Sequence, residues 1–318
     1  LYMSHYAVHD PIQGRKDLVK KYSEKLKDKD KNNNPAYILE GNPDNPNNPS
    51  RKELDSLINT PDYEAYKILP KGTVKVKQKQ DNVEFAAMVE SMDESLGRII
   101  AKLKELGIQD NTIIFFYSDN GGMSAINFGN PKRIVPKAQQ DIAYSTSNLP
   151  LRGAKGWLYE GGIRVPLIVK WPGKGMQNAE SSTPVTSVDI FPTILNMVGF
   201  PEGIGKDKEG VDISPLIKGE TINRGPIYWH FPHYSNHGMQ SPGGAIRDGD
   251  YKLLEYFENG TVQLFNLKND IEEQKDLSKM EVEKTKELKE KLHKWRKNVG
   301  AQMMKPNPDY NALLKAEL

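Results

Sequence analysis

Residues 81–122, DNVEFAAMVESMDESLGRIIAKLKELGIQDNTIIFFYSDNGG, join a helix pattern directly to a strand pattern. In the first part, apolar residues recur at spacings of three and four, the period of an amphipathic helix: Phe85, Val89, Met92, Leu96, Ile99, Leu103 and Leu106. Asp81 or Asn82 can cap the start of this helix, and Gly107 can end it. The run TIIFFYS is continuous and rich in β-formers, so it predicts a strand buried on both faces in a parallel sheet. Helix, short turn and buried strand together predict an α/β unit.

The segments on either side of this unit extend the α/β pattern from the start of the chain to about residue 225. VPLIVKW, residues 165–171, predicts a second strand. SVDIFPTILNMVG, residues 187–199, predicts a helix with Pro192 in its first turn, where proline is tolerated. Residues 15–31 predict a charged surface helix and residues 32–50 an Asn/Pro-rich stretch that is mostly loop, so we expect an insert over about 16–80. That insert is either a solvated excursion or a segment that faces the substrate.

The pattern changes to antiparallel hairpins after residue 225. GGAIRDGDYKLLEYF, residues 243–257, contains an Asp-Gly turn, and FENGTVQLF, residues 257–265, contains an Asn-Gly turn; both predict hairpins. A final amphipathic helix ends before Gly300 and has one apolar face, formed by Leu288, Leu292, Trp295 and Val299. We therefore expect an α/β domain over 1–225 and a smaller C-terminal subdomain over 226–318, with an antiparallel sheet and a terminal helix.

Composition excludes several classes of function. The 44 Lys and Arg residues balance the 42 Asp and Glu residues and are dispersed, so no field favours nucleic acid or an anionic membrane as a partner. The longest apolar run is too short to cross a bilayer. The chain has no cysteine, which excludes disulfides, zinc thiolate sites and a cysteine nucleophile among these residues.

Asp119 and Asn120 follow the predicted buried strand directly. In open parallel sheets, sites gather beyond the carboxyl ends of the strands. A carboxylate beside an amide suits a hard cation, and the glycines that follow let the backbone come close to it. The same four residues, DNGG, are also a common plain turn, so the position after a strand is what favours a site.

Lys155 and His9 are candidates for binding or protonating an anionic group. Lys155 lies among small residues in RGAKG, where its ammonium can reach an oxyanion as a point charge. His9 stands where a predicted strand gives way to a loop and can bind an anion or donate a proton. Both residues also have a plain structural reading. We expect nearby Arg152, Glu160 and Arg164 to be structural.

His230 and His233 lie among aromatic residues in YWHFPHY, residues 228–234. Such a stretch is typical of the wall of a carbohydrate pocket, and we predict that both histidines bind substrate. Aromatic packing beneath a hairpin explains the same composition.

Four segments, in this order, resemble the type I sulfatases, relatives of arylsulfatase A in the alkaline phosphatase superfamily. They are SHYAVHDPIQ, the segment MVESMDESLGRIIAKLKELGIQDNTIIFFYSDNGG, LRGAKGWLYEGGIRVPLIVKWPG and AIRDGDYKLL. The resemblance implies an alkaline-phosphatase-like sandwich around a central, mostly parallel sheet. It implies that Asp119 and Asn120 supply two calcium ligands and that Lys155 and His9 hold the sulfate. His9 or a neighbour is then the expected proton donor to the departing alcohol.

The resemblance also implies a formylglycine nucleophile, matured from Cys or Ser in a CxPxR or SxPxR pattern, and two further aspartate ligands on a preceding strand. The chain has no cysteine, Ser182 lacks the arginine because Thr186 occupies that place, and the proline after Ser147 comes one place too late. We therefore expect the chain to be the C-terminal two-thirds of a sulfatase whose N-terminal segment is a partner. Asp119 and Asn120 alone fall short of the six to eight oxygens of calcium.

The expected function is hydrolysis of sulfuric esters, with a sulfated carbohydrate as substrate. Two alternatives remain: a phosphodiester or phosphonate hydrolase of the same superfamily, and a non-catalytic glycan-binding protein. By analogy with the family we expect a periplasmic or extracellular location.

Overall fold

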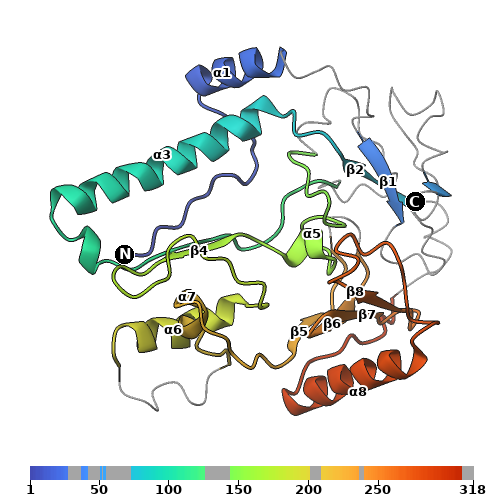
Figure 1. Cartoon of the computed structure of the whole chain (residues 1–318). Coiled ribbons are helices and arrows are strands. Elements are labelled where there is room, and N and C mark those ends of the chain that lie inside the picture. Colours follow the sequence, from blue (N-terminus) through green and yellow to red (C-terminus); the bar gives the residue numbers. More distant parts are fainter. Residues whose placement is uncertain are drawn as a thin grey trace.

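The computed structural model describes residues 1–27, 37–41, 51, 53–54, 73–125, 144–200, 209–235 and 240–309. The helices and strands are α1 (Lys16–Lys27), β1 (Tyr37–Gly41), β2 (Thr73–Lys77), α3 (Val83–Glu105), η2 (Gln109–Asn111), β3 (Ile114–Tyr117), α5 (Glu160–Ile163), β4 (Leu167–Lys170), η4 (Ser187–Asp189), α6 (Ile190–Met197), α7 (Ser214–Ile217), β5 (Ile227–Phe231), β6 (Gly243–Asp248), β7 (Tyr251–Tyr256), β8 (Val262–Asn266) and α8 (Val282–Asn298). Figure 1 shows α1 alongside α3 at one end of the molecule and α8 beneath the C-terminal sheet at the other. Within the described residues, no helix is both long and apolar enough to span a bilayer.

The long helix α3 forms where the apolar periodicity predicts it. The Asn82 side chain accepts a hydrogen bond from the backbone N–H of Phe85 (3.1 Å), which satisfies one of the free donors of the first turn. Past the other end, Gly107 has a φ of +68°, a conformation that favours glycine. The predicted cap and stop are both confirmed.

Strand β3 also lies where it is expected, but its surroundings differ from the prediction. It pairs antiparallel with β4, with Tyr117 opposite Leu167. Tyr117 is 39% exposed and Ile168 is 64% exposed, so the predicted burial on both faces is wrong. The two strands are antiparallel, so the chain needs no crossover helix between them, and no further described strand pairs with β3.

Within residues 32–50, which are predicted to be mostly loop, residues 37–41 form the strand β1. This strand pairs antiparallel with β2, from Tyr37 opposite Lys77 to Gly41 opposite Thr73. Ile38, Leu39 and Val76 are buried there. The remainder of residues 32–50 lies outside the described residues.

The C-terminal sheet has the order β5-β6-β7-β8, and every neighbouring pair is antiparallel. Both predicted hairpins are confirmed, and the turn glycines Gly249 and Gly260 have φ values of +59° and +68°. Side chains alternate between the two faces. One face packs on Trp157 and Tyr159, and the other packs on α8.

The predicted helices at 187–199 and near the C-terminus are also present. Residues 187–197 form η4 and α6, with Pro192 in the first turn of α6. On α8, Leu288 and Leu292 are buried and Trp295 packs against them, whereas Val299 is 47% exposed. Val299 follows the last helical residue, so its place on the apolar face is a wrong prediction.

The boundary near residue 225 stays a prediction. The larger hydrophobic core takes residues from both sides of it: Ala154, Trp157 and Tyr159 pack with Ala245, Leu254, Tyr256 and Phe265. The C-terminal sheet is therefore packed against the segment that carries Lys155.

Candidate active site

Two glycine-rich segments meet at the end of the β3–β4 pair. The backbone N–H of Gly121 donates to the Gly162 carbonyl (2.9 Å), and the backbone N–H of Lys155 donates to the Gly122 carbonyl (3.1 Å). A Cβ on Gly121 would lie 1.8 Å from the Gly161 oxygen, so only glycine allows this approach. Backbone hydrogen bonds thus join the DNGG turn and the RGAKG segment into one structural unit.

Lys155 and His9 contact each other directly in this unit. The Lys155 Nζ lies 2.8 Å from the His9 Nε2. On the other side of the ring, the His9 Nδ1 lies 2.9 Å from both the carbonyl oxygen and the Oδ1 of Asp10. The hydrogen bond to the Asp10 carbonyl assigns the ring proton to Nδ1, so Nε2 accepts from the ammonium of Lys155. The His9 side chain is 46% exposed, so the pair is open to solvent.

Asp119 and Asn120 lie on the loop that precedes this contact. The Asp119 Oδ1 accepts the backbone N–H of Asn120 (2.9 Å), and the Asn120 Nδ2 donates to the Gly121 carbonyl (2.9 Å). Carboxylate and amide oxygens are the donors that a hard cation prefers, so the chemistry of the two residues fits calcium. Within the described residues, however, no group of three or more His, Asp or Glu side chains could hold a metal ion. Asp119 and Asn120 therefore amount to part of a coordination sphere.

Asn148 is a further residue of this unit that the sequence reasoning missed. Its Nδ2 lies 2.8 Å from the Gly122 carbonyl, 3.0 Å from that of Gly161 and 3.3 Å from that of Gly153. One amide group thus bridges three glycine-rich turns. The only sequence signal is its place just before LPLRGAKG, because an asparagine in a loop has no pattern of its own.

Arg152 and Glu160 have the structural role expected of them. They belong to a set that we call the buried ion cluster: Arg152, Glu160, Lys252 and Glu273, each at most 2% exposed. The Lys252 Nζ lies 3.0 Å from a Glu160 oxygen and 2.9 Å from a Glu273 oxygen. The Arg152 Nη1 donates to the Glu273 carbonyl (2.8 Å), and its guanidinium lies 4.3 Å from the centre of the Tyr159 ring.

Burial and neighbouring charges shift the pKa values in the cluster in opposite directions. Burial raises the pKa of Glu273 to about 7, although Lys252 opposes this shift. Burial also acts to raise the pKa of Glu160, but Lys252 and Arg247 outweigh it and hold that pKa below its usual value. One carboxylate is thus firmly ionised and the other is poised to take a proton.

Arg164 lies at the rim of the cluster. Its side chain is 54% exposed, and its Nη1 lies 3.9 Å from Glu160. It therefore contributes a distant, solvent-screened contact, which agrees with a structural role.

The structure does not bring His230 and His233 into contact with the other predicted site residues. The His230 Nε2 lies 2.7 Å from the Gln302 carbonyl, and its ring packs on Phe257. His230 alternates with Trp229, which packs on the core that contains Trp157, so His230 points to the α8 face of the sheet. His233 is exposed and meets the edge of Phe231.

The model of the sulfatase family matches residues 1–200, and the model of the C-terminal part of N-sulphoglucosamine sulphohydrolase matches residues 154–298. The chain belongs to the sulfatase family. The family implies, in general terms, a divalent metal ion and a formylglycine.

Three relatives show how much of a sulfatase the chain represents. A sulfatase of Formosa agariphila is 29% identical over 318 residues, which cover 86% of this chain and 54% of that protein. The steryl-sulfatase of Rattus norvegicus is 33% identical over 137 residues, which cover 43% of this chain and 22% of that protein. The solved structure of Ps i-CgsB aligns with a TM-score of 0.61 at 24% identity over 93% of this chain and 49% of that chain. The chain spans about half or less of the length of these relatives.

The structural comparison supports the predicted fold class. The chain shares an alkaline-phosphatase-like α/β fold with Ps i-CgsB and with the protein yidJ of Bacteroides fragilis, and its C-terminal sheet is antiparallel. A complex of Ps i-CgsB with k-i-k-neocarrahexaose also aligns, with a TM-score of 0.55 at 30% identity, covering 69% of this chain and 44% of that chain.

Proposed function

We propose that the protein hydrolyses sulfuric esters of carbohydrates, and that Lys155 and His9 hold the sulfate group. The observation that carries the proposal is the 2.8 Å contact between the Lys155 ammonium and the His9 imidazole beside the DNGG turn. A lysine that donates to a neutral imidazole keeps its positive charge uncompensated, and two of its three N–H groups are left for another acceptor. A sulfate oxygen is such an acceptor.

The same contact suggests how His9 protonates the leaving alcohol. With the ring proton assigned to Nδ1, His9 would need a second proton at Nε2, taken from solvent, before it could donate one to the alcohol. A bound sulfate would draw the ammonium of Lys155 away from Nε2 and place negative charge beside the ring. Asp10, at 2.9 Å from Nδ1, would stabilise the imidazolium that results.

The proposal also requires two groups that are not seen in this chain, a formylglycine and a metal ion. A formylglycine would supply the nucleophile for sulfur, and we place it outside these 318 residues because they contain no cysteine and no serine in an SxPxR pattern. Asp119 and Asn120 would hold Ca²⁺, which when bound supplies positive charge close to the sulfate. The remaining oxygen ligands would come from elsewhere in the protein.

The test of the function is release of inorganic sulfate from sulfated sugars by the purified protein. Sugar phosphates, phosphodiesters and phosphonates are assayed in parallel, because a superfamily hydrolase of phosphorus esters would prefer these. Intact mass under denaturing conditions determines whether formylglycine is present. Formylglycine without sulfate release would reject the proposal, and binding of sulfated sugar without any turnover would favour the non-catalytic alternative.

The metal assignment has its own test in Asp119→Asn. Replacing the carboxylate by an amide removes one unit of ligand charge, so we expect Ca²⁺ affinity, measured by calorimetry, to fall at least tenfold. Asp110→Asn, an exposed aspartate just before β3, is the matched control and should leave the affinity unchanged. Equal affinities in the two variants would remove DNGG from the metal site.

The choice of a carbohydrate and the cellular location are also proposals. Among the relatives, one is a steryl-sulfatase and another is solved with a neocarrahexaose, so the family itself does not fix the substrate. The aromatic stretch 228–234 supports a sugar, and His230 and His233, which do not contact Lys155 or His9, would bind a part of the substrate away from the sulfate. We propose a periplasmic or extracellular location, where polymeric sulfated glycans are met.

A further inference from the structure

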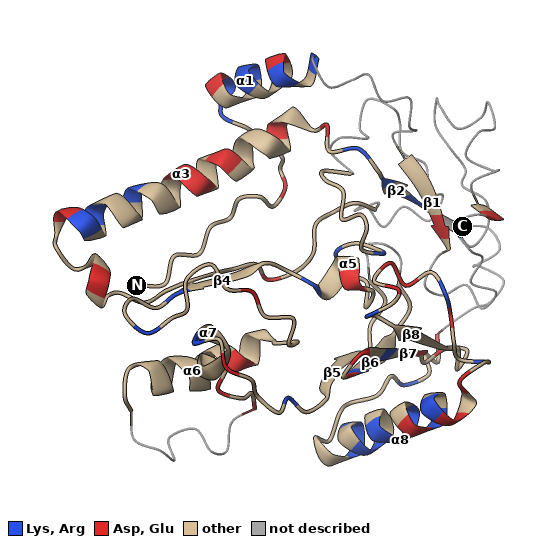
Figure 2. Cartoon of the chain, viewed as in Figure 1, with Lys and Arg blue, Asp and Glu red and all other residues tan. Residues whose placement is uncertain are grey.

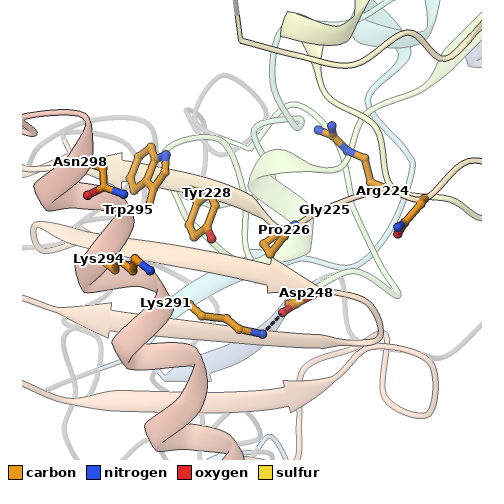
Figure 3. Close-up of a pocket in the computed structure, with 10 residues that line it drawn as sticks. Arg224, Gly225, Pro226, Tyr228, Asp248, Lys291, Lys294, Trp295 and Asn298 are labelled. Carbon is orange, nitrogen blue, oxygen red and sulfur yellow. Dashed lines mark hydrogen bonds and ion pairs between the residues drawn. The ribbon is translucent and has the colours of Figure 1, made fainter.

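A pocket of about 570 Å³ lies between the start of β5, the end of β6 and helix α8 (Figure 3). Tyr228 lines it from β5 and Trp295 from α8. Tyr228 and Leu253 belong to the cluster that packs on α8, whereas Trp229 packs on the opposite core. The pocket is therefore on the face of the C-terminal sheet that points away from Trp157 and the Lys155 segment.

One end of the pocket is an aromatic slab. The rings of Tyr228 and Trp295 stack with centroids 4.8 Å apart and planes 3° apart. Both residues are only partly buried, so ring surface stays accessible. A fixed pair of rings offers a flat apolar surface with little conformational entropy to lose, and this suits the C–H face of a sugar ring.

Charged side chains also line the pocket, and they differ in whether they have an ionic partner. Lys291 is satisfied, because it lies 2.7 Å from Asp248 and 2.7 Å from Glu287. Lys294 is exposed and, within the described residues, makes no hydrogen bond or ion pair. Figure 3 shows Lys294 on the same helix as Trp295, with Arg224 across the pocket.

Arg224 adds a second unmet donor. Its Nη2 lies 3.3 Å from the buried carboxylate of Asp189, but its Nε is buried and has no hydrogen-bond partner in the described part of the chain. A buried unpaired donor is costly unless a ligand or water satisfies it. The side-chain amides of Asn223 and Asn298 also line the pocket and can pair with hydroxyl groups.

We propose that this pocket binds one residue of an acidic carbohydrate chain, with the sugar ring against the Tyr228–Trp295 pair and its acidic group on Lys294. The volume accommodates a sugar residue with its substituents. The choice of sulfate as the acidic group rests on the proposed function; the ring platform and the unmatched lysine do not. The site would hold a polymer at a distance from Lys155 and His9.

The experiment measures binding of a dextran sulfate oligosaccharide by calorimetry. All proteins carry Lys155→Ala, so that the contact proposed for the active site is removed. Lys294→Ala should lower the affinity about fivefold, the effect of losing one exposed charge contact. Lys297→Ala, an exposed lysine on the same helix that does not line the pocket, is the control and should change it less than twofold.

Further probes separate the sugar from the charge. Unsulfated dextran should bind more weakly than dextran sulfate but lose affinity in Trp295→Leu, with near-UV circular dichroism to check that α8 stays packed. Equal losses in Lys294→Ala and Lys297→Ala would overturn the proposal. So would inorganic polyphosphate that competes as well as dextran sulfate, because it has the charge without the ring.

Sulfate release, assayed separately with Lys155 intact, distinguishes this proposal from the proposed function. Binding that depends on Lys294 without any sulfate release would refute the proposed function alone. Sulfate release with no dependence of binding on Lys294 would refute the pocket alone.

Discussion

The candidate active site and the buried ion cluster share one short segment, 151–164, which supplies Lys155 to the site and Arg152 and Glu160 to the cluster. Lys155 of the site meets a neutral imidazole and, within the described residues, no carboxylate. Lys252 of the cluster is fully buried and meets two carboxylates. In the cluster, each buried charge has a partner of opposite sign, so the fold tolerates its burial. In the site, the charge of Lys155 has no such partner, so a bound anion can take that place. The partners of each charged side chain, rather than its residue type, therefore distinguish a structural charge from a functional one.

The two regions are also mechanically connected. Helix α5 begins at Glu160, whose backbone N–H donates to the Glu273 carboxylate (2.6 Å) and whose side chain pairs with Lys252. The next residues, Gly161 and Gly162, accept the contacts that hold Gly121 and Asn148. The cluster therefore anchors the loops that position Lys155.

The largest effect is expected from Lys252→Met, which separates the two roles by damaging only the cluster. The change removes the lysine that Glu160 and Glu273 share and leaves Glu160 with only the more distant Arg247 (3.5 Å) and Arg164 (3.9 Å). Breaking a buried pair in this way costs about 3–5 kcal/mol. The midpoint of urea unfolding should fall accordingly. Lys284→Met removes one side of an exposed pair with Glu287 and should change stability by less than about 1 kcal/mol. Similar losses of stability in both variants would show that the buried ion cluster stabilises the fold no more than an exposed ion pair does.

The reverse effect is expected from Lys155→Ala, which damages only the site. Loss of the cation from the sulfate-binding pair should reduce kcat by about 10²–10³-fold, the usual cost of losing one positioned electrostatic donor. The unfolding midpoint should stay near that of the unaltered protein, because Lys155 is not buried. Lys174→Ala is the control, since Lys174 also stands between glycines, in Gly173–Gly175, but packs on Trp171. A normal rate in Lys155→Ala would remove this lysine from the reaction.

Asn148→Ala tests the connection between the two regions. Without the amide, the glycine carbonyls at 122 and 161 lose a shared donor, which costs about 1–3 kcal/mol of stability. We expect kcat to fall about tenfold with little change in KM, because Lys155 is displaced rather than removed. Asn196→Ala, whose amide donates to Asp212 and Ser214 far from the site, should lower stability without lowering kcat. A parallel loss of kcat in Asn196→Ala would mean that Asn148 acts through stability alone.

Sequence alone predicts the elements whose signals are local. The cap at Asn82, the stop at Gly107 and the turns at Gly249 and Gly260 each depend on a few adjacent residues, and all are present. Strand β1 was missed because its partner β2 lies beyond a long intervening segment. The burial of β3 was overestimated because an apolar run predicts a strand but does not say what covers it.

Residues of the candidate site could be predicted only where the chemistry of the side chain and the resemblance to a known family indicated the same role. Lys155 and His9 are 146 positions apart, so no pattern in the sequence joins them. Asn148 has no residue type or spacing that marks it out from other loop asparagines. Alternation along β5 predicts that His230 and Trp229 point to opposite faces, but not which face carries the site. The sequence thus predicts the face of the sheet to which a side chain points, but not whether that face carries a functional site.

The last expected effect is a pH dependence that belongs to the cluster and not to the site. Burial raises the pKa of Glu273 from 4.5 to about 7, so between these values the folded state keeps a proton that the unfolded state releases. Stability must then fall as pH rises through this range, at up to about 1.4 kcal/mol per pH unit. Glu273→Gln carries no titrating proton, so its stability relative to the unaltered protein should improve by about 2 kcal/mol between pH 5 and pH 7.

The neighbouring Glu272 provides the control, because it is 45% exposed and pairs with Arg51 at the surface. In Glu272→Gln the difference from the unaltered protein should stay nearly constant over the same range. If Glu273→Gln also showed a constant difference, Lys252 would be holding Glu273 ionised throughout, and both carboxylates would share its charge. The two carboxylates of the cluster would then balance Arg152 and Lys252 over the whole range, and the contrast between a matched interior and an unmatched site would not depend on pH.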